Sequence, residues 1–141
     1  MRDIPWSEII GRIILPAIIN TLQMMFFCFI FSAVLGFVIA VSLYITREDG
    51  LRPNKIIFNI LNGSISILRS FPFMILMVII IPLTRIITGS SIGWTAALVP
   101  LTFASMPFMA RTIENSIKEV NPALIDAAKS VGASDMQIIF K

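Results

Sequence analysis

Residues 18–45 read IINTLQMMFFCFIFSAVLGFVIAVSLYI, and this stretch decides the fold class. Its strongly polar side chains are limited to Asn20, Thr21, Gln23, Ser32 and Ser42. A helix needs ~20 mostly apolar residues to cross the ~30 Å hydrocarbon core of a bilayer. As a helix, residues 18–45 would be about 42 Å long, because each residue adds about 1.5 Å. The stretch therefore predicts a membrane-spanning helix.

The composition of the whole chain indicates the same surroundings. Of its 141 residues, 57% are hydrophobic and 13% are charged, whereas about 25% of residues are charged in a soluble domain. Two further apolar runs, 56–81 and 95–113, are long enough to span, although Arg69 and Pro72 interrupt the first. A polar turn at 46–55 and a loop at 82–94 separate the runs. We predict one all-α integral membrane domain, 1–141, with about three transmembrane helices.

Residues 1–17 are expected to lie outside the membrane or at its surface. The segment Pro5–Ile14 mixes isoleucines with charged side chains, which suits a short helix lying on the membrane. Trp6 would anchor it at the interface.

The third run, 95–113, contains two prolines at positions 100 and 107, which fall on nearly the same helix face. Small side chains in this run would let another helix approach closely. They are Ala96, Ala97, Ala104, Ser105 and Ala110.

The distribution of lysine and arginine predicts the orientation, since positive charge favours the cytoplasmic side. If the loop after the first span is inside, the cytoplasmic side carries Arg47, Arg52, Lys55, Arg111, Lys118, Lys129 and Lys141. The outer side then carries Arg2, Arg12 and Arg85. The imbalance favours an external N-terminus and a cytoplasmic segment 121–141.

Segment 121–141 has the signals of two short helices joined by a turn. Asn121 suits a helix cap, Pro122 the first helical position and Gly132 a left-handed stop. Ser134 and Gln137 then match a capping box that opens a second helix. The first helix places Leu124, Ala127, Ala128 and Val131 on one apolar face, and the second offers Met136, Ile139 and Phe140 for burial.

Two interpretations of this helix-turn-helix remain open from the residues alone. It could pack on its own membrane helices as an ordinary hairpin, or it could dock with a partner in the cytoplasm.

The composition argues against several other classes of function. The chain has no histidine, the usual general base and commonest metal ligand. Its one cysteine, Cys28, lies in an apolar run, where we interpret it as a small packing residue. We therefore expect no catalytic residue, no metal or cofactor site in this chain, and no nucleic-acid-binding arm.

Residues Pro122–Ser134 resemble the cytoplasmic EAA loop of ABC importer permeases, with Asp126 in place of the usual glutamate. Four further segments are similar to the methionine-import branch of that family. They are RSFPF at 69–73, IPLTR at 81–85, VPLT at 99–102 and PFMAR at 107–111.

This resemblance implies part of a type I ABC importer permease fold, in which segment 121–141 is a coupling helix-turn-helix. It implies an ATP-driven importer of an amino acid, methionine by similarity, in a bacterial inner membrane. The expected partners are ATP-binding subunits, which hydrolyse the ATP, a second permease copy, an external substrate-binding protein and lipid. By similarity, the residues that dock with the ATP-binding subunit are Leu124, Asp126, Ala127, Ala128, Gly132, Ala133 and Ser134.

Permeases of this kind usually have about five spans, so the chain is expected to be partial. The alternatives are a structural or regulatory membrane subunit that does not transport, or a non-functional permease fragment.

Arg69 is the most informative charge outside the loops. Fourteen residues after Lys55, it would lie ~21 Å along a helix. A charge at membrane depth usually faces a bundle interior or an aqueous cavity. We expect Arg69, Ser70 and Pro72 to line the bundle interior or the transport path. An equal alternative is that Arg69 caps carbonyls loosened near Pro72.

Overall fold

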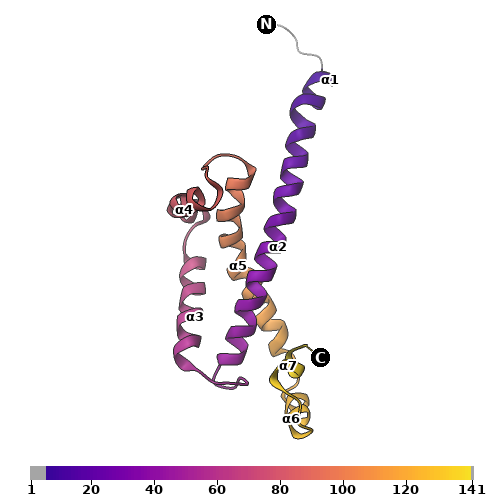
Figure 1. Ribbon diagram of the computed structural model, residues 1–141, viewed down its shortest axis with the longest axis vertical. Helices are drawn as coiled ribbons and strands as arrows, with labels where there is room; N and C mark the ends of the chain where they lie inside the picture. Colours follow the sequence, from indigo (N-terminus) through magenta and orange to yellow (C-terminus); the bar gives the residue numbers. More distant parts are fainter. Residues whose placement is uncertain (1–5, 141) are drawn as a thin grey trace.

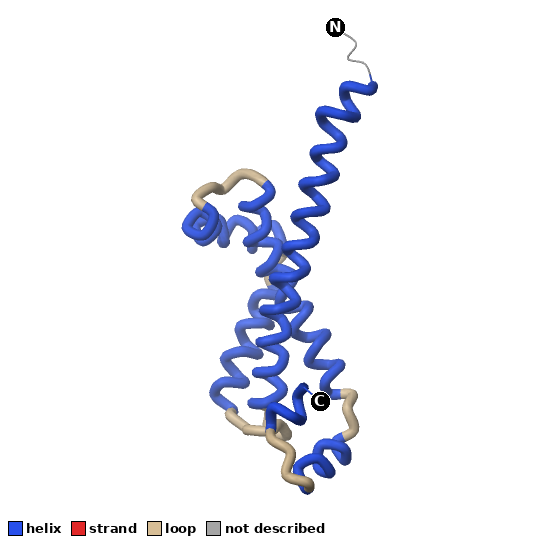
Figure 2. The backbone as a smooth tube through the Cα atoms, turned by 45° about the vertical axis from the view of Figure 1, so that its right-hand side comes forward, coloured by secondary structure: helices blue, strands red, loops and turns tan. Residues whose placement is uncertain are grey.

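A computed structural model describes residues 6–140, all of which lie in helices or the loops between them (Figures 1 and 2). The side chains of Trp6, Ser7, Met136 and Phe140 lie outside the described part. The expectations that Trp6 anchors the chain and that Met136 and Phe140 are buried therefore fall outside the described residues.

Residues 6–46 form one long helix rather than a surface helix followed by a span. The short helix α1 (Trp6–Ile9) passes through a π-helical turn, η1 (Ile10–Ile14), into α2 (Leu15–Thr46). The separate interfacial helix expected at Pro5–Ile14 is thus not observed. Pro16 cannot donate a backbone hydrogen bond, and the turn just before it loosens locally instead of breaking.

The second apolar run, expected as a single helix at 56–81, is broken. Helix α3 (Lys55–Ser70) and helix α4 (Phe73–Thr88) meet at an angle of 115°. Phe71 is extended, with φ −78° and ψ 130°, because the ring of Pro72 disfavours helical geometry in the residue before it. The sequence identified the interruption but not the size of the bend.

Helix α4 is also longer than predicted, because it continues through Pro82, which we expected to open a loop. Proline is tolerated inside apolar helices where neighbouring groups satisfy the freed backbone. The helix ends at Gly89, whose φ of 72° is readily adopted by glycine. The connecting loop is therefore only 89–93.

The chain continues with α5 (Trp94–Lys118), which runs past the expected end at Ile113, then α6 (Pro122–Ser130) and α7 (Asp135–Phe140). Within the described residues, 10–46 and 94–118 are each long and apolar enough to cross a membrane. The bent pair of α3 and α4 makes a third if it counts as one span.

Helix α5 is the centre of the packing, since α2 crosses it and both α3 and α4 lie against it (Figures 1 and 2). At the crossing with α2, Gly36 faces Met109 and the backbone of Ala110. One apolar cluster joins α2, α3 and α5 through Leu43, Ile65 and Ala110. A second joins α4 to α5 through Leu76, Ile80 and Val99.

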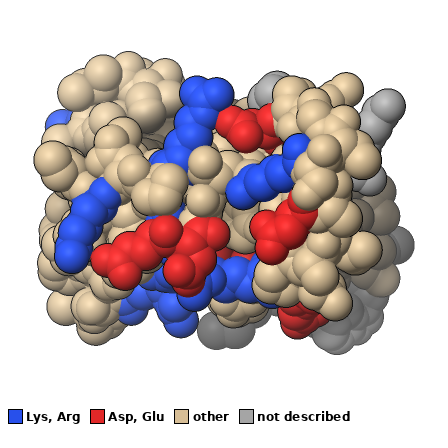
Figure 3. Space-filling view, turned by 90° about the horizontal axis from the view of Figure 1, so that it is seen from below, with Lys and Arg blue, Asp and Glu red and all other residues tan. Residues whose placement is uncertain are grey.

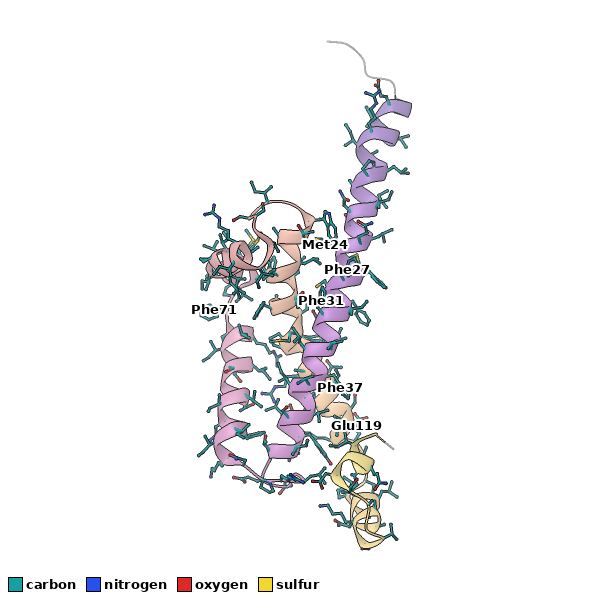
Figure 4. The ribbon with its side chains drawn as sticks, viewed as in Figure 1. Met24, Phe27, Phe31, Phe37, Phe71 and Glu119 are labelled. Atoms are coloured by element: carbon teal, nitrogen blue, oxygen red, sulfur yellow. The ribbon has the colours of Figure 1, made fainter. Side chains whose placement is uncertain are left out.

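The predicted small residues on α5 thus serve helix contact, as Ala96 and Ala110 are buried. Before the crossing, many large apolar side chains of α2 are exposed, among them Leu22, Phe26 and Phe29 (Figure 4). Phe27 stacks on Trp94 at the start of α5, with 6.2 Å between the ring centroids. This apolar outer surface suits a hydrocarbon environment.

Candidate functional site

The candidate site is the pair α6 and α7 with the turns that frame them, residues 121–140, which we call the α6–α7 hairpin. It lies at the end of the molecule farthest from the N-terminus (Figure 1). The side chain of Asn121 accepts a hydrogen bond from the Ala123 amide at 3.0 Å, so the predicted cap is confirmed.

The predicted turn at Gly132 is also present. Its φ is 82°, in the left-handed region. The Gly132 amide donates to the Lys129 carbonyl and the Ala133 amide to the Ala128 carbonyl, both at 3.0 Å. These two bonds form a Schellman motif, which satisfies the last carbonyls of α6 and fixes the direction in which the chain leaves it.

The second helix starts with the predicted capping box. The Ser134 amide donates to Gln137 Oε1 at 2.9 Å, and the Gln137 amide donates to Ser134 Oγ at 3.4 Å. Both helices of the hairpin are therefore capped by their own side chains, and their geometry does not depend on a partner.

The hairpin has an inner and an outer side. Ile125 is partly buried and lines a cavity against α2, whereas Leu124 is 65% and Val131 85% exposed. Three of the four residues expected on the apolar face of α6, namely Leu124, Ala128 and Val131, line one groove beside α7. Of the predicted docking residues, Leu124, Asp126, Ala127, Gly132 and Ser134 are exposed, and Ala128 and Ala133 are partly buried.

A groove of about 630 Å³ runs along the hairpin between its two helices. It is lined by residues of both, including Leu124, Ala128, Val131, Gly132 and Ile138. The hairpin therefore offers an apolar surface of the size that a partner side chain or helix end could fill.

Two contacts seat the hairpin against the membrane helices. Ile125 of α6 and Ile138 and Ile139 of α7 close a small cavity of about 150 Å³ against Phe37, Val41 and Tyr44 of α2. Figure 4 labels Phe37 on α2 and Glu119 at the end of α5, just before the hairpin. In addition, Arg52 Nε donates to Asp135 Oδ2 at 2.7 Å.

The end of the molecule that carries the hairpin is rich in charge of both signs (Figure 3). Exposed ion pairs in the loop between α2 and α3 join Arg47 to Asp49 and Lys55 to Glu48, each at 3.5 Å. Such exposed pairs contribute little to stability, but they make this surface polar and wet.

The second predicted group, Arg69, Ser70 and Pro72, lies elsewhere. All three are exposed, at the break between α3 and α4, where Figure 4 labels Phe71. Ser70 Oγ donates to the Ser66 carbonyl at 2.8 Å. The Arg69 side chain makes no hydrogen bond or ion pair with any of the described residues, 6–140. The expected capping of backbone carbonyls near Pro72 by Arg69 is therefore not observed among them.

A buried charge cluster on α5 was not predicted. Glu114 is 1% exposed, and its two oxygens pair with Arg111 Nη1 at 2.7 Å and Lys118 Nζ at 2.5 Å. Arg111 Nη2 also donates to Asn62 Oδ1 on α3. The sequence could have indicated this cluster, because Arg111, Glu114 and Lys118 are spaced i, i+3 and i+7, which places them on one helix face.

Comparison with known proteins identifies the family. Residues 44–141 match the model of the family described as binding-protein-dependent transport system inner membrane component. The chain belongs to this family. It is accordingly an inner-membrane component, and the α6–α7 hairpin falls within the matched region.

The chain is also similar to individual members. It is 44% identical over 135 residues to the D-methionine transport system permease protein MetI of Yersinia pestis and 41% identical to that of Salmonella typhi. Each alignment covers 96% of this chain and 62% of the relative. The chain therefore spans less than two thirds of the length of the curated relatives it matches.

A chain of the MetNI methionine ABC transporter in an inward-facing conformation has a TM-score of 0.89 to this structure at 40% identity. The match covers 95% of this chain and 62% of that one. A second crystal form of the same transporter gives a TM-score of 0.86. The predicted fold class, an all-α type I importer permease fold, is confirmed.

Proposed function

We propose that this chain is the membrane-spanning permease subunit, or part of it, of an ATP-driven methionine importer. The observation that carries the proposal is the α6–α7 hairpin, which is fully capped and presents Leu124, Ala127 and Val131 outward. Its partner in this proposal is an ATP-binding subunit, which performs the hydrolysis. A second permease copy and an external substrate-binding protein complete the assembly.

The mechanism that fits this geometry is alternating access driven from the hairpin. Closure of the ATP-binding subunits displaces α6, and because the hairpin is continuous with α5, the membrane helices rock as rigid bodies. The chain binds no ATP and needs no cofactor of its own in this scheme. Methionine is the proposed substrate because relatives at 40–44% identity carry that name.

The test is to express the complete reading frame that encodes this chain with its ATP-binding subunits and to reconstitute both in proteoliposomes. ATP-dependent uptake of methionine in the presence of the binding protein is the expected result. Co-purification without uptake would favour a regulatory or structural subunit. If the chain showed no co-purification and no uptake, the proposal would be overturned.

A matched pair of variants locates the docking surface. Ala127 is exposed, whereas Ala128 is partly buried in the groove between α6 and α7. Ala127→Trp should block association of the ATP-binding subunit and leave the purified permease as stable as the wild type. Ala128→Trp should in addition lower permease stability by about 1–3 kcal/mol, because it overpacks the groove between α6 and α7. Normal association of both variants would exclude this face of α6 as the docking surface.

A further inference from the structure

The buried charge cluster on α5 has no role in the docking proposed above. Glu114 is almost completely removed from solvent, and both of its partners are largely covered, with Arg111 23% and Lys118 32% exposed. Ionised groups are costly to bury unless each is paired. The pairing therefore restrains the position of the Glu114 carboxylate and of the two cations that contact it.

Among the contacts of residues 6–140, Arg111 is the member of the cluster that reaches another helix. One terminal nitrogen of its guanidinium donates to Glu114 on α5, and the other donates to Asn62 on α3. The planar fork of arginine holds two acceptors at once in a fixed geometry. A lysine at this position would keep the charge but offer a single donor group, so it could not serve both acceptors in the same way.

The place of the cluster along α5 connects it to the hairpin. Arg111, Glu114 and Lys118 occupy the last two turns of α5, and α6 begins four residues later at Pro122. The link between them is a tight turn, because the Glu119 amide donates to the Ser116 carbonyl and the Val120 amide to the Ile117 carbonyl. A displacement of α6 is therefore passed directly to the turns that carry Arg111.

Other contacts between α3 and α5 here are apolar. Ile65 of α3 packs with Ala110 of α5, and Phe58 and Leu61 surround them. Apolar contact is not directional, so it specifies the register between the helices less sharply than a hydrogen bond does. The hydrogen bond from Arg111 to Asn62 is directional, so it sets the register between the helices.

We propose that Arg111 is a positioning residue that locks α3 to α5, so that displacement of the α6–α7 hairpin moves the two helices as one body. The body would end at the Phe71–Pro72 break, beyond which α4 turns away from α3. The transport consequences of this lock rest on the function proposed above, but the lock itself can be measured separately.

The experiment uses Asn62→Leu, which removes the acceptor and keeps a similar volume, and Arg111→Lys, which keeps the charge. The matched control is Asn59→Leu, the same change one turn earlier on α3 at an exposed position. Asn62→Asp is the rescue variant, because its carboxylate accepts from the same guanidinium nitrogen. Glu114 is left unchanged, since its removal would strand two covered cations and could unfold the helix end.

The first measurement is a distance distribution between spin labels on α3 and α5, independent of transport. Labels at Ile56 and Ser116, both exposed, in a Cys28→Ser background suit this purpose. The wild type, Asn59→Leu and Asn62→Asp should give one narrow distribution, and Asn62→Leu and Arg111→Lys a broader one. A narrow, unshifted distribution in both of the latter variants would overturn the proposal.

The second measurement is the ratio of ATP hydrolysed to methionine taken up by the complete transporter. Asn62→Leu and Arg111→Lys should raise this ratio at least about threefold without changing the amount of ATP-binding subunit that co-purifies. Wild-type ratios in both would show that the lock has no part in coupling and would overturn the proposal. Failure of the wild type itself to transport methionine would contradict the proposed function, while the label distances would still decide the lock.

Discussion

Gly36 of α2 lies against Met109 of α5 so closely that a Cβ atom on Gly36 would come within 2.7 Å of the Met109 Cβ atom. The same atom would lie 3.0 Å from the Ala110 amide nitrogen. Real carbon atoms do not approach this closely, so only glycine permits the present crossing of the two helices. Close approach of this kind is a main source of affinity between helices in a membrane.

Gly36→Ala is therefore expected to lower the stability of the permease in detergent by ~1–3 kcal/mol, because α2 and α5 must move apart. The matched control is Gly63→Ala on α3, where an added Cβ meets nothing within 4 Å. Gly63→Ala should be neutral or stabilising by ~0.5–1 kcal/mol, since alanine favours helix more than glycine does. Thermal unfolding followed by tryptophan fluorescence compares the two. Equal midpoints would show that the crossing is not tight at Gly36.

Features of this structure that depend on residues close together in the sequence could be predicted, whereas features that depend on distant residues could not. The caps at Asn121 and Ser134 and the turn at Gly132 each depend on hydrogen bonds between residues at most five positions apart, and all three were predictable. The sharp bend at Pro72 was not, because an apolar run gives no indication of whether neighbouring helices keep it straight.

The contact between Asn62 and Arg111 joins residues 49 positions apart. Asn62 looks like one polar residue among several on α3, and only the packing of α3 on α5 brings it to the guanidinium. The same holds for Arg52 and Asp135, which are 83 positions apart. Periodicity identifies which face of a helix is buried, but it does not identify the partner.

The orientation of the chain stays a prediction, based on the excess of lysine and arginine on one side. Single cysteines at Asp49 and Ser90, both exposed, in a Cys28→Ser background test it. An impermeant thiol reagent added to intact cells should label Ser90→Cys and not Asp49→Cys. Permeabilised cells are the control and should show labelling at both positions. The opposite pattern in intact cells would reverse the orientation.

Arg69 is expected to face water or protein in the assembled permease. Its side chain is exposed in this chain and has no polar partner within residues 6–140. Leaving it in hydrocarbon would cost at least ~2.5 kcal/mol on insertion scales. Arg69→Leu should thus reduce assembly or uptake more than it reduces membrane insertion.

The comparison variant for Arg69 is Arg85→Leu, near the end of α4, where Arg85 Nε donates to Ser91 Oγ at 2.7 Å. Arg85→Leu also removes one positive charge, but at a position next to a loop, where water is available. If Arg69→Leu and Arg85→Leu have the same small effect on uptake and detergent stability, Arg69 has no special role.

The last prediction concerns Gly132, the residue that fixes the angle between α6 and α7. With φ at 82°, it occupies a conformation that costs a residue with a side chain roughly 1–2 kcal/mol. A β-branched side chain is among the worst tolerated there, whereas asparagine adopts this conformation more readily than most residues. Apart from its two chain neighbours, no described residue has an atom within 4 Å of the position of its missing Cβ, so backbone strain rather than a clash is the expected cause.

Gly132→Val should therefore distort the Schellman turn and move Ser134 out of its capping position, while α2 to α5 stay folded. Association with the ATP-binding subunit should weaken by roughly 5- to 30-fold, the factor that corresponds to 1–2 kcal/mol. Gly132→Asn should keep most of the binding, which separates a conformational effect from the mere presence of a side chain. Both variants are compared with the wild type by co-purification of the ATP-binding subunit and by methionine uptake in the complete transporter. If Gly132→Val inserts normally, retains the ATP-binding subunit and transports at the wild-type rate, the hairpin is a packing element and does not transmit energy.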